Sequence, residues 1–136
     1  MFEQDYLMRL VMQFIDAINR SMQRASGEED HDAAARLLDD AIGTATDIDG
    51  GVLLDLTPDS MAEVLSVSGT DPRVLEYVGR SLLLSSQYWQ EAGNEDLARL
   101  RAGQARSLAS AYAFYLDEAV SADESMRAFL ESQEEA

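Results

Sequence analysis

The sequence predicts an all-α fold, in which antiparallel helical hairpins form a single compact bundle of about six helices. Three observations predict it. Apolar residues recur at spacings of three and four along most of the chain, as they do on one face of a helix. The 136 residues include only 2 Pro and 8 Gly, so few positions interrupt a helix. No segment shows the alternation of apolar and polar residues that is typical of a half-buried strand. The pattern is clearest over residues 75–116, where two amphipathic stretches flank a tight turn at residues 92–94.

The N-terminal third of the chain is predicted to form the first two helices. The first is expected over residues 2–24, with an apolar stripe wide enough to contact two neighbouring helices. This stripe consists of Leu7, Leu10, Val11, Phe14, Ile15, Ile18 and Met22. An acidic loop over residues 25–32 follows, and the second helix is expected to end near residue 45. Residues 47–51 end it because their two glycines allow a sharp turn.

Two helix-start signals, each a capping residue followed by proline, mark the beginnings of the middle helices. Thr57 can cap a brief third helix, and Pro58 is favourable at its first position. We expect its inward-facing residues to be Met61, Val64 and Leu65. Asp71 and Pro72 repeat the signal and start a fourth helix, which is predicted to reach residue 92.

The fourth and fifth helices are predicted to form a hairpin. Gly93 can end the fourth helix in a left-handed conformation, and Asn94 can cap the fifth, which we expect to extend to about residue 119. Its apolar positions form two rows, namely Ala98, Ala102, Ala105, Ala109, Tyr112 and Leu116 in one, and Leu97, Leu100, Leu108 and Tyr115 in the other. A last helix is expected to begin at a capping box over residues 121–124 and to end in an acidic, frayed tail at about residues 131–136. The whole chain, residues 1–136, is then a single domain.

The charge and composition of the chain limit its partners. It has 26 acidic residues and 10 basic ones, and its formal net charge is −16. That charge would repel a phosphate backbone and an anionic bilayer, so we expect no nucleic-acid partner and no membrane partner. No apolar run approaches the ~18 residues of a membrane-spanning helix, and the acidic start predicts no secretory signal. We therefore expect a cytoplasmic protein. Its basic residues are all Arg, which together with abundant Ala indicates a GC-rich bacterial source.

No motif predicts catalysis, a metal site or a cofactor. The absence of cysteine excludes disulfides, thiolate metal sites and thiol nucleophiles. The stretch 47–50 is similar to the middle of a calcium loop, but Ala45 and Leu56 would then stand at its first and last ligand positions, so we interpret it as a helix-ending turn. His31, the one histidine, is expected at the surface among acidic neighbours that favour its charged form. Neighbouring carboxylates such as Asp39 and Asp40 are expected on solvated faces.

The predicted hairpin resembles tetratricopeptide repeats (TPR), a family of helical hairpins that bind other proteins. The family pattern of large, small, aromatic, turn Gly and further small residues falls on Leu82, Ser86, Trp89, Gly93, Ala98 and Ala105. A second hairpin resembles it over Ile18, Met22, Ala34, Leu38 and Ala41. The segment 2–9 is also similar to the start of an uncharacterised bacterial family of small TPR-like proteins. The resemblance implies a groove along the fourth helix, and its candidate partner-binding residues are Arg80, Leu83, Gln87 and Gln90.

Three classes of function are compatible with these patterns. The first is a non-catalytic protein–protein interaction module, which uses the helical groove or associates with itself as a homodimer. The alternative is a helical bundle that binds a small ligand or a metal, possibly an enzyme of unknown reaction. The third is an acidic decoy of a nucleic-acid-binding protein, which rests on the net charge alone. Since no catalytic set is present in the sequence, we favour the interaction module.

Overall fold

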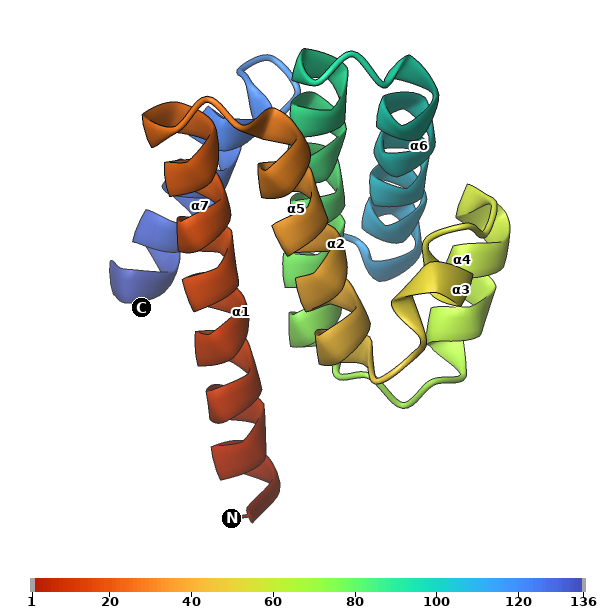
Figure 1. Ribbon diagram of the computed structural model, residues 1–136. Helices are drawn as coiled ribbons and strands as arrows, with labels where there is room; N and C mark the ends of the chain where they lie inside the picture. Colours follow the sequence, from red (N-terminus) through yellow and green to blue (C-terminus); the bar gives the residue numbers. More distant parts are fainter. Residues whose placement is uncertain (1, 136) are drawn as a thin grey trace.

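The structure, a computed structural model, describes residues 2–135 and is entirely helical over that range apart from its connecting turns and loops (Figure 1). The predicted all-α class is therefore confirmed. The described chain contains seven helices, one more than expected. They are α1 (Phe2–Gly27), α2 (His31–Thr46), α3 (Gly50–Leu53), α4 (Pro58–Ser66), α5 (Pro72–Glu91), α6 (Glu95–Tyr112) and α7 (Ala122–Glu135). The additional helix is α3, a single turn in a segment for which we predicted no helix.

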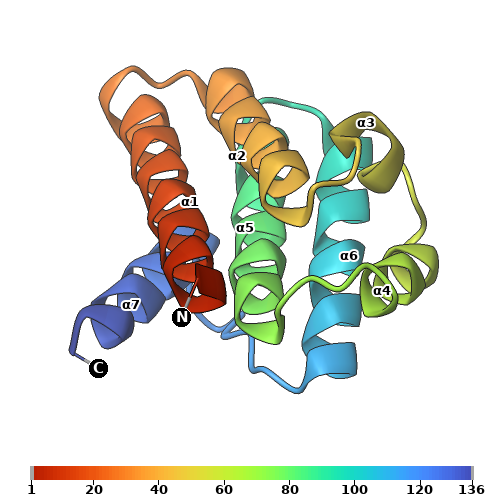
Figure 2. The same ribbon diagram turned by 90° about the horizontal axis from the view of Figure 1, so that it is seen from below.

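The four long helices pack in a row in the order α1, α2, α5, α6 (Figure 2). Each of the two hairpins, α1–α2 and α5–α6, buries the apolar face of one helix against the other, and α2 joins the hairpins by packing on α5. Helix α4 covers α6 and helix α7 covers α5. The first turns of α1 project beyond the bundle (Figure 1). Helix α5 is therefore the centre of the fold, in contact with helices on several sides.

Local capping explains where most of the helices begin. The side chains of Thr57 and Asn94 accept hydrogen bonds from the backbone N–H groups of Ser60 and Leu97, which satisfies free donors of the first turn. Asp71 does the same for Arg73. Gly93 has a φ of +90°, a conformation that glycine adopts without strain and that ends α5. The predicted starts of α4, α5 and α6 are thereby confirmed.

The core lies between the hairpins and under α7. Phe14 of α1, Tyr77 of α5 and Phe129 of α7 form an aromatic cluster in which the ring centres of Phe14 and Tyr77 are 6.2 Å apart and those of Tyr77 and Phe129 are 5.0 Å apart. Two predicted inward residues are instead at the surface. Val64 faces solvent on α4, and Tyr115 is 75% exposed because it lies beyond the end of α6.

Helix α1 ends at Gly27, three residues later than predicted, and the two larger differences lie near the C-terminus. Helix α6 ends at Tyr112 rather than near residue 119, because Ala113 takes a left-handed conformation with a φ of 57° and turns the chain back towards α5. Residues 113–121, which we call the linker, connect α6 to α7. Helix α7 continues to Glu135, so the tail predicted to be frayed is helical over residues 131–135, and residue 136 lies outside the described range.

Candidate functional site

The first half of the linker lies on the face of α5 that we predicted to be a groove. Phe114 packs directly on the α5 backbone at Gly79, where an added Cβ would lie 2.4 Å from the Cζ atom of the ring. Arg80 donates a hydrogen bond of 3.0 Å to the carbonyl oxygen of Tyr115, and its guanidinium carbon lies 4.3 Å from the ring centre of Phe129. Because Gly79 has no side chain, the ring of Phe114 can pack directly on α5, and Arg80 binds the linker backbone at the next residue.

The second half of the linker and the first turn of α7 are held from opposite sides. Arg106 of α6 donates hydrogen bonds of 2.7 and 3.1 Å to Oε1 of Glu118, and these bonds hold the pKa of that carboxyl below its usual range. On the opposite side, Oε1 of Gln87 accepts a hydrogen bond of 3.1 Å from the backbone N–H of Asp123, at the start of α7. Helix α6 therefore anchors the linker, and helix α5 anchors the start of α7 that follows it.

Beyond this anchored segment the same face opens into a hollow of about 520 Å³ between α5, α6 and the end of the linker. We call this hollow the groove. Its walls carry Leu83, Ser86, Gln87, Gln90, Glu95, Ala98, Arg99, Ala102 and Arg106, and the linker with the start of α7 closes one side with Glu118, Val120, Ser121 and Ala122. Other hollows, of about 320 to 700 Å³, lie elsewhere on the described surface, and the smallest of these lies between α1 and α2.

Three of the four candidate residues, Leu83, Gln87 and Gln90, line the groove. Arg80 lies outside it, where its guanidinium is engaged with Glu76 and with the linker. Gln87 has a double role, because its amide oxygen holds Asp123 while its amide nitrogen donates a hydrogen bond to Glu91. Leu83 and Gln90 are therefore the two predicted residues whose side chains contribute to the groove without also holding the linker in the described contacts.

The groove differs in charge from the rest of this acidic chain. Its lining contains Arg99 and Arg106 together with Glu95 and Glu118, so its formal charges balance, whereas the whole protein has a formal net charge of −16. Arg106 is paired with Glu118. Arg99 makes a looser contact of 3.5 Å with Asp96, and the side chains of Arg99 and Asp96 are largely exposed. Ser86 donates a hydrogen bond of 2.6 Å to the carbonyl oxygen of Ala98, which holds α5 and α6 close together. The groove between the two helices is shallow because they pack so closely.

A second polar cluster, centred on Asp39 and Arg101, was not predicted from the sequence. Their side chains are 13% and 5% exposed, and the closest nitrogen–oxygen distance of the ion pair is 3.1 Å. Asp39 also accepts hydrogen bonds from Ser85 and Trp89, at 2.8 and 3.2 Å. Asp40 is exposed as expected, but the prediction that both carboxylates are solvated was wrong for Asp39. No sequence pattern pairs residues 62 positions apart, so only the fold reveals this site.

This cluster is structural, because its polar atoms bind one another and the backbone. Arg101 donates a hydrogen bond of 2.8 Å to the carbonyl oxygen of Leu54, and Gln104 donates to the carbonyl oxygens of Leu54 and Leu56 at 3.0 and 2.9 Å. These bonds attach the segment between α3 and α4 to α6. A buried guanidinium paired with a carboxylate satisfies the requirement that buried charges be paired.

His31 and the turn at Asp47 both lie outside the groove. His31 lies against Glu91 of α5, with its Nε2 atom 3.1 Å from Oε2, rather than against the acidic residues next to it in sequence. Asp47 ends α2 with a φ of 55°, which agrees with a helix-ending turn. Within residues 2–135 no group of three His, Cys, Asp or Glu side chains is arranged to hold a metal ion. Over the same range, no helix combines the length and the apolar character needed to cross a membrane.

The fold and the groove define a class of structure: two stacked helical hairpins with a shallow groove on the second. Comparisons with protein-family models, with curated proteins and with solved structures gave no match to this chain. Its function is therefore inferred from the chain's own residues.

Proposed function

We propose that this protein is a non-catalytic protein–protein interaction module whose groove binds a short non-helical segment of a partner protein. The observation that carries the proposal is the linker itself. The face of α5 that forms the groove already binds one non-helical segment, through Phe114 at Gly79 and Arg80 at the carbonyl oxygen of Tyr115. The groove continues this face beyond the point where the linker leaves it, next to Leu83 and Gln90.

The lining of the groove indicates what a partner segment should contain. Ala98 and Ala102 allow the backbone of a partner to approach closely, and Leu83 offers an apolar contact. The amide of Gln90 can donate to and accept from a peptide backbone. Arg99 can pair with an acidic side chain of the partner, as Arg106 pairs with Glu118 of the linker. The expected ligand is therefore a short segment with a small apolar residue followed by an acidic one.

The likeness to tetratricopeptide repeats is part of this proposal. Two antiparallel hairpins, α1–α2 and α5–α6, stack through the contact between α2 and α5, which supports a repeat-like arrangement. In such stacks the hairpins form an extended concave surface for peptides. The enzymatic and metal-binding alternatives have no comparable support, since the buried Asp39–Arg101 pair is occupied by its own hydrogen bonds.

The test is selection of short peptides from a random library displayed on phage, with the purified protein as the target. Selected peptides are then titrated against Leu83→Gln and Gln90→Glu variants. We expect the first change to weaken binding about tenfold because it places an amide on the apolar wall, and the second to weaken binding of acidic peptides. Arg80 and Gln87 are poor test positions, because changing them would also release the linker.

The matched control is Val67→Gln, which makes a similar apolar-to-amide change at a residue that is 85% exposed and lies outside the groove. It should bind the selected peptides like the wild type. Nuclear magnetic resonance shifts on peptide addition should cluster at Ser86, Gln90, Ala98 and Ala102. Failure to select any peptide, or shifts that map away from the groove, would overturn the proposal.

A further inference from the structure

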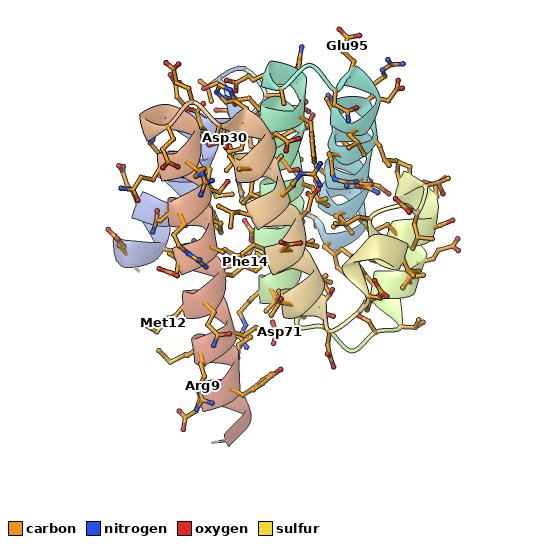
Figure 3. The ribbon with its side chains drawn as sticks, in the orientation of Figure 1. Arg9, Met12, Phe14, Asp30, Asp71 and Glu95 are labelled. Carbon is orange, nitrogen blue, oxygen red and sulfur yellow. The ribbon has the colours of Figure 1, made fainter. Side chains whose placement is uncertain are left out.

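The projecting part of α1 has an apolar face that points away from the bundle. Met8 and Met12 are 58% and 65% exposed, and Ile15, one turn further on, is half-buried at the edge of the core. Figure 3 shows Met12 on the side of α1 away from α2, whereas Phe14 lies on the bundle side. The separations of four and three residues place Met8, Met12 and Ile15 on one helical face, which we call the seam.

Charged residues form a regular row along one edge of the seam. They are Asp5, Arg9, Asp16 and Arg20, all exposed, and they alternate in sign from the start of α1. Their separations of four, seven and four residues correspond to about one, two and one helical turns, so they share one edge. Arg20 lies 3.1 Å from Asp16 in an ion pair within the helix, and both side chains remain well exposed.

This row is complementary to itself when two copies of α1 run antiparallel. A two-fold axis between Met12 and Gln13 places Asp5 opposite Arg20 of a second copy and Arg9 opposite Asp16 of that copy. Symmetry generates the two reverse pairs, so every charge in the row faces an opposite charge. The same operation brings the two Met12 side chains together. A parallel pair in register would instead place like charges opposite one another, which is unfavourable.

We propose that the seam of α1 binds a second copy of this protein in an antiparallel pair. The contact from Asp5 to Arg20 would extend over about 22 Å of helix, at 1.5 Å per residue. The charge row fixes both the direction and the register of the pair, and the exposed methionines supply apolar area. The net charge of −16 opposes association, so the dimer should be weak and should depend on these local pairs. The proposal goes beyond the groove and does not depend on it.

The test uses two double variants, in each of which all four charges of the row have the same sign. The cationic variant carries Asp5→Arg and Asp16→Arg, and the anionic variant carries Arg9→Asp and Arg20→Asp. Each alone would place like charges opposite one another in the dimer, so we expect sedimentation velocity to show self-association weakened about tenfold or more. An equimolar mixture restores all four pairs and should form a heterodimer at least as stable as the wild-type dimer.

Additional variants test the apolar part of the seam. Met12→Glu should abolish the dimer, whereas Gln13→Glu makes a similar change in charge at an exposed neighbour off the seam and should leave the dimer formed. Circular dichroism confirms that each variant remains helical. The proposal is overturned when the wild type stays monomeric up to about 1 mM. It is also overturned when the single-sign variants dimerise like the wild type, or when their mixture fails to pair.

Discussion

Removing the carboxylate of Asp39 should destabilise the fold strongly, because buried polar groups of α5 and α6 depend on it. In Asp39→Ala the guanidinium of Arg101, whose side chain is 5% exposed, loses two hydrogen bonds of 3.1 and 3.3 Å. Ser85 and Trp89 lose their acceptor at the same time. The guanidinium remains charged, and too little of it reaches the surface for water to replace the lost partner.

The expected loss follows from the burial of this pair. Breaking a buried ion pair by removing one partner costs about 3–5 kcal/mol. A domain is stable by only about 5–15 kcal/mol, so this change removes a large part of the free energy of unfolding. For a chain of this length the melting temperature should fall by roughly 10–20 °C. Removing both charges in Asp39→Leu with Arg101→Met should cost clearly less than the sum of the two single changes, because no unpaired charge remains.

Urea unfolding measures this loss, with two independent readouts. Far-ultraviolet circular dichroism follows the helices, and fluorescence follows Trp89, the one tryptophan, whose indole N–H is bonded to Asp39. Asp40→Ala is the matched control, since Asp40 is the exposed next residue on the same helix and should change stability by about 0.5 kcal/mol or less. A result in which Asp39→Ala and Asp40→Ala are equally stable would refute the structural role of the cluster.

Two further predictions concern the linker. Gly79→Ala should destabilise the protein by about 1–3 kcal/mol, because the new Cβ would lie 2.4 Å from Phe114. The loss should shrink sharply in a Phe114→Ala background. Urea unfolding of the wild type, the two single variants and the double variant measures both effects. Hydrogen bonds from Arg106 lower the pKa of Glu118 in the folded protein. The ion pair therefore contributes its full stabilisation at pH values above 4.5, the ordinary pKa of a glutamate. This contribution is lost as the pH falls from 4.5 through the lower pKa of the folded state. Glu118→Gln should therefore reduce the difference in urea midpoint between about pH 6 and about pH 3, and an unchanged difference would argue against the ion pair.

The parts of the fold that were predictable from sequence depend on neighbours within one helical turn. Thr57 and Asn94 cap helices through bonds that reach only three residues ahead. Gly93 ends α5 through its own backbone conformation. The spacing of apolar residues likewise identifies a helical face without reference to the rest of the chain. These local signals were sufficient for the all-α class and for the starts of the middle helices.

The end of α6 could not be predicted because distant contacts decide it. The apolar spacing continues past Ala113 to Leu116, so the sequence favours a longer helix. The chain turns instead, and the ring of Phe114 packs on the backbone at Gly79, a residue far earlier in the chain. The same kind of contact changes the interpretation of the groove, because Arg80 was expected to face a partner and is engaged by the linker. Such contacts leave no periodic signal in the sequence.

The two proposed surfaces are compatible with each other because they lie on different helices. Figure 2 shows α1 and α6 at opposite ends of the row of long helices, so an antiparallel pair formed through the seam leaves the groove between α5 and α6 uncovered. A dimer would then present two grooves. A partner with two suitable segments would bind the second groove as an intramolecular step, so its apparent affinity would exceed that of a single segment. Disrupting the seam with Met12→Glu should remove this gain for a two-segment peptide and leave the affinity of a one-segment peptide unchanged, which distinguishes the function of the seam from that of the groove.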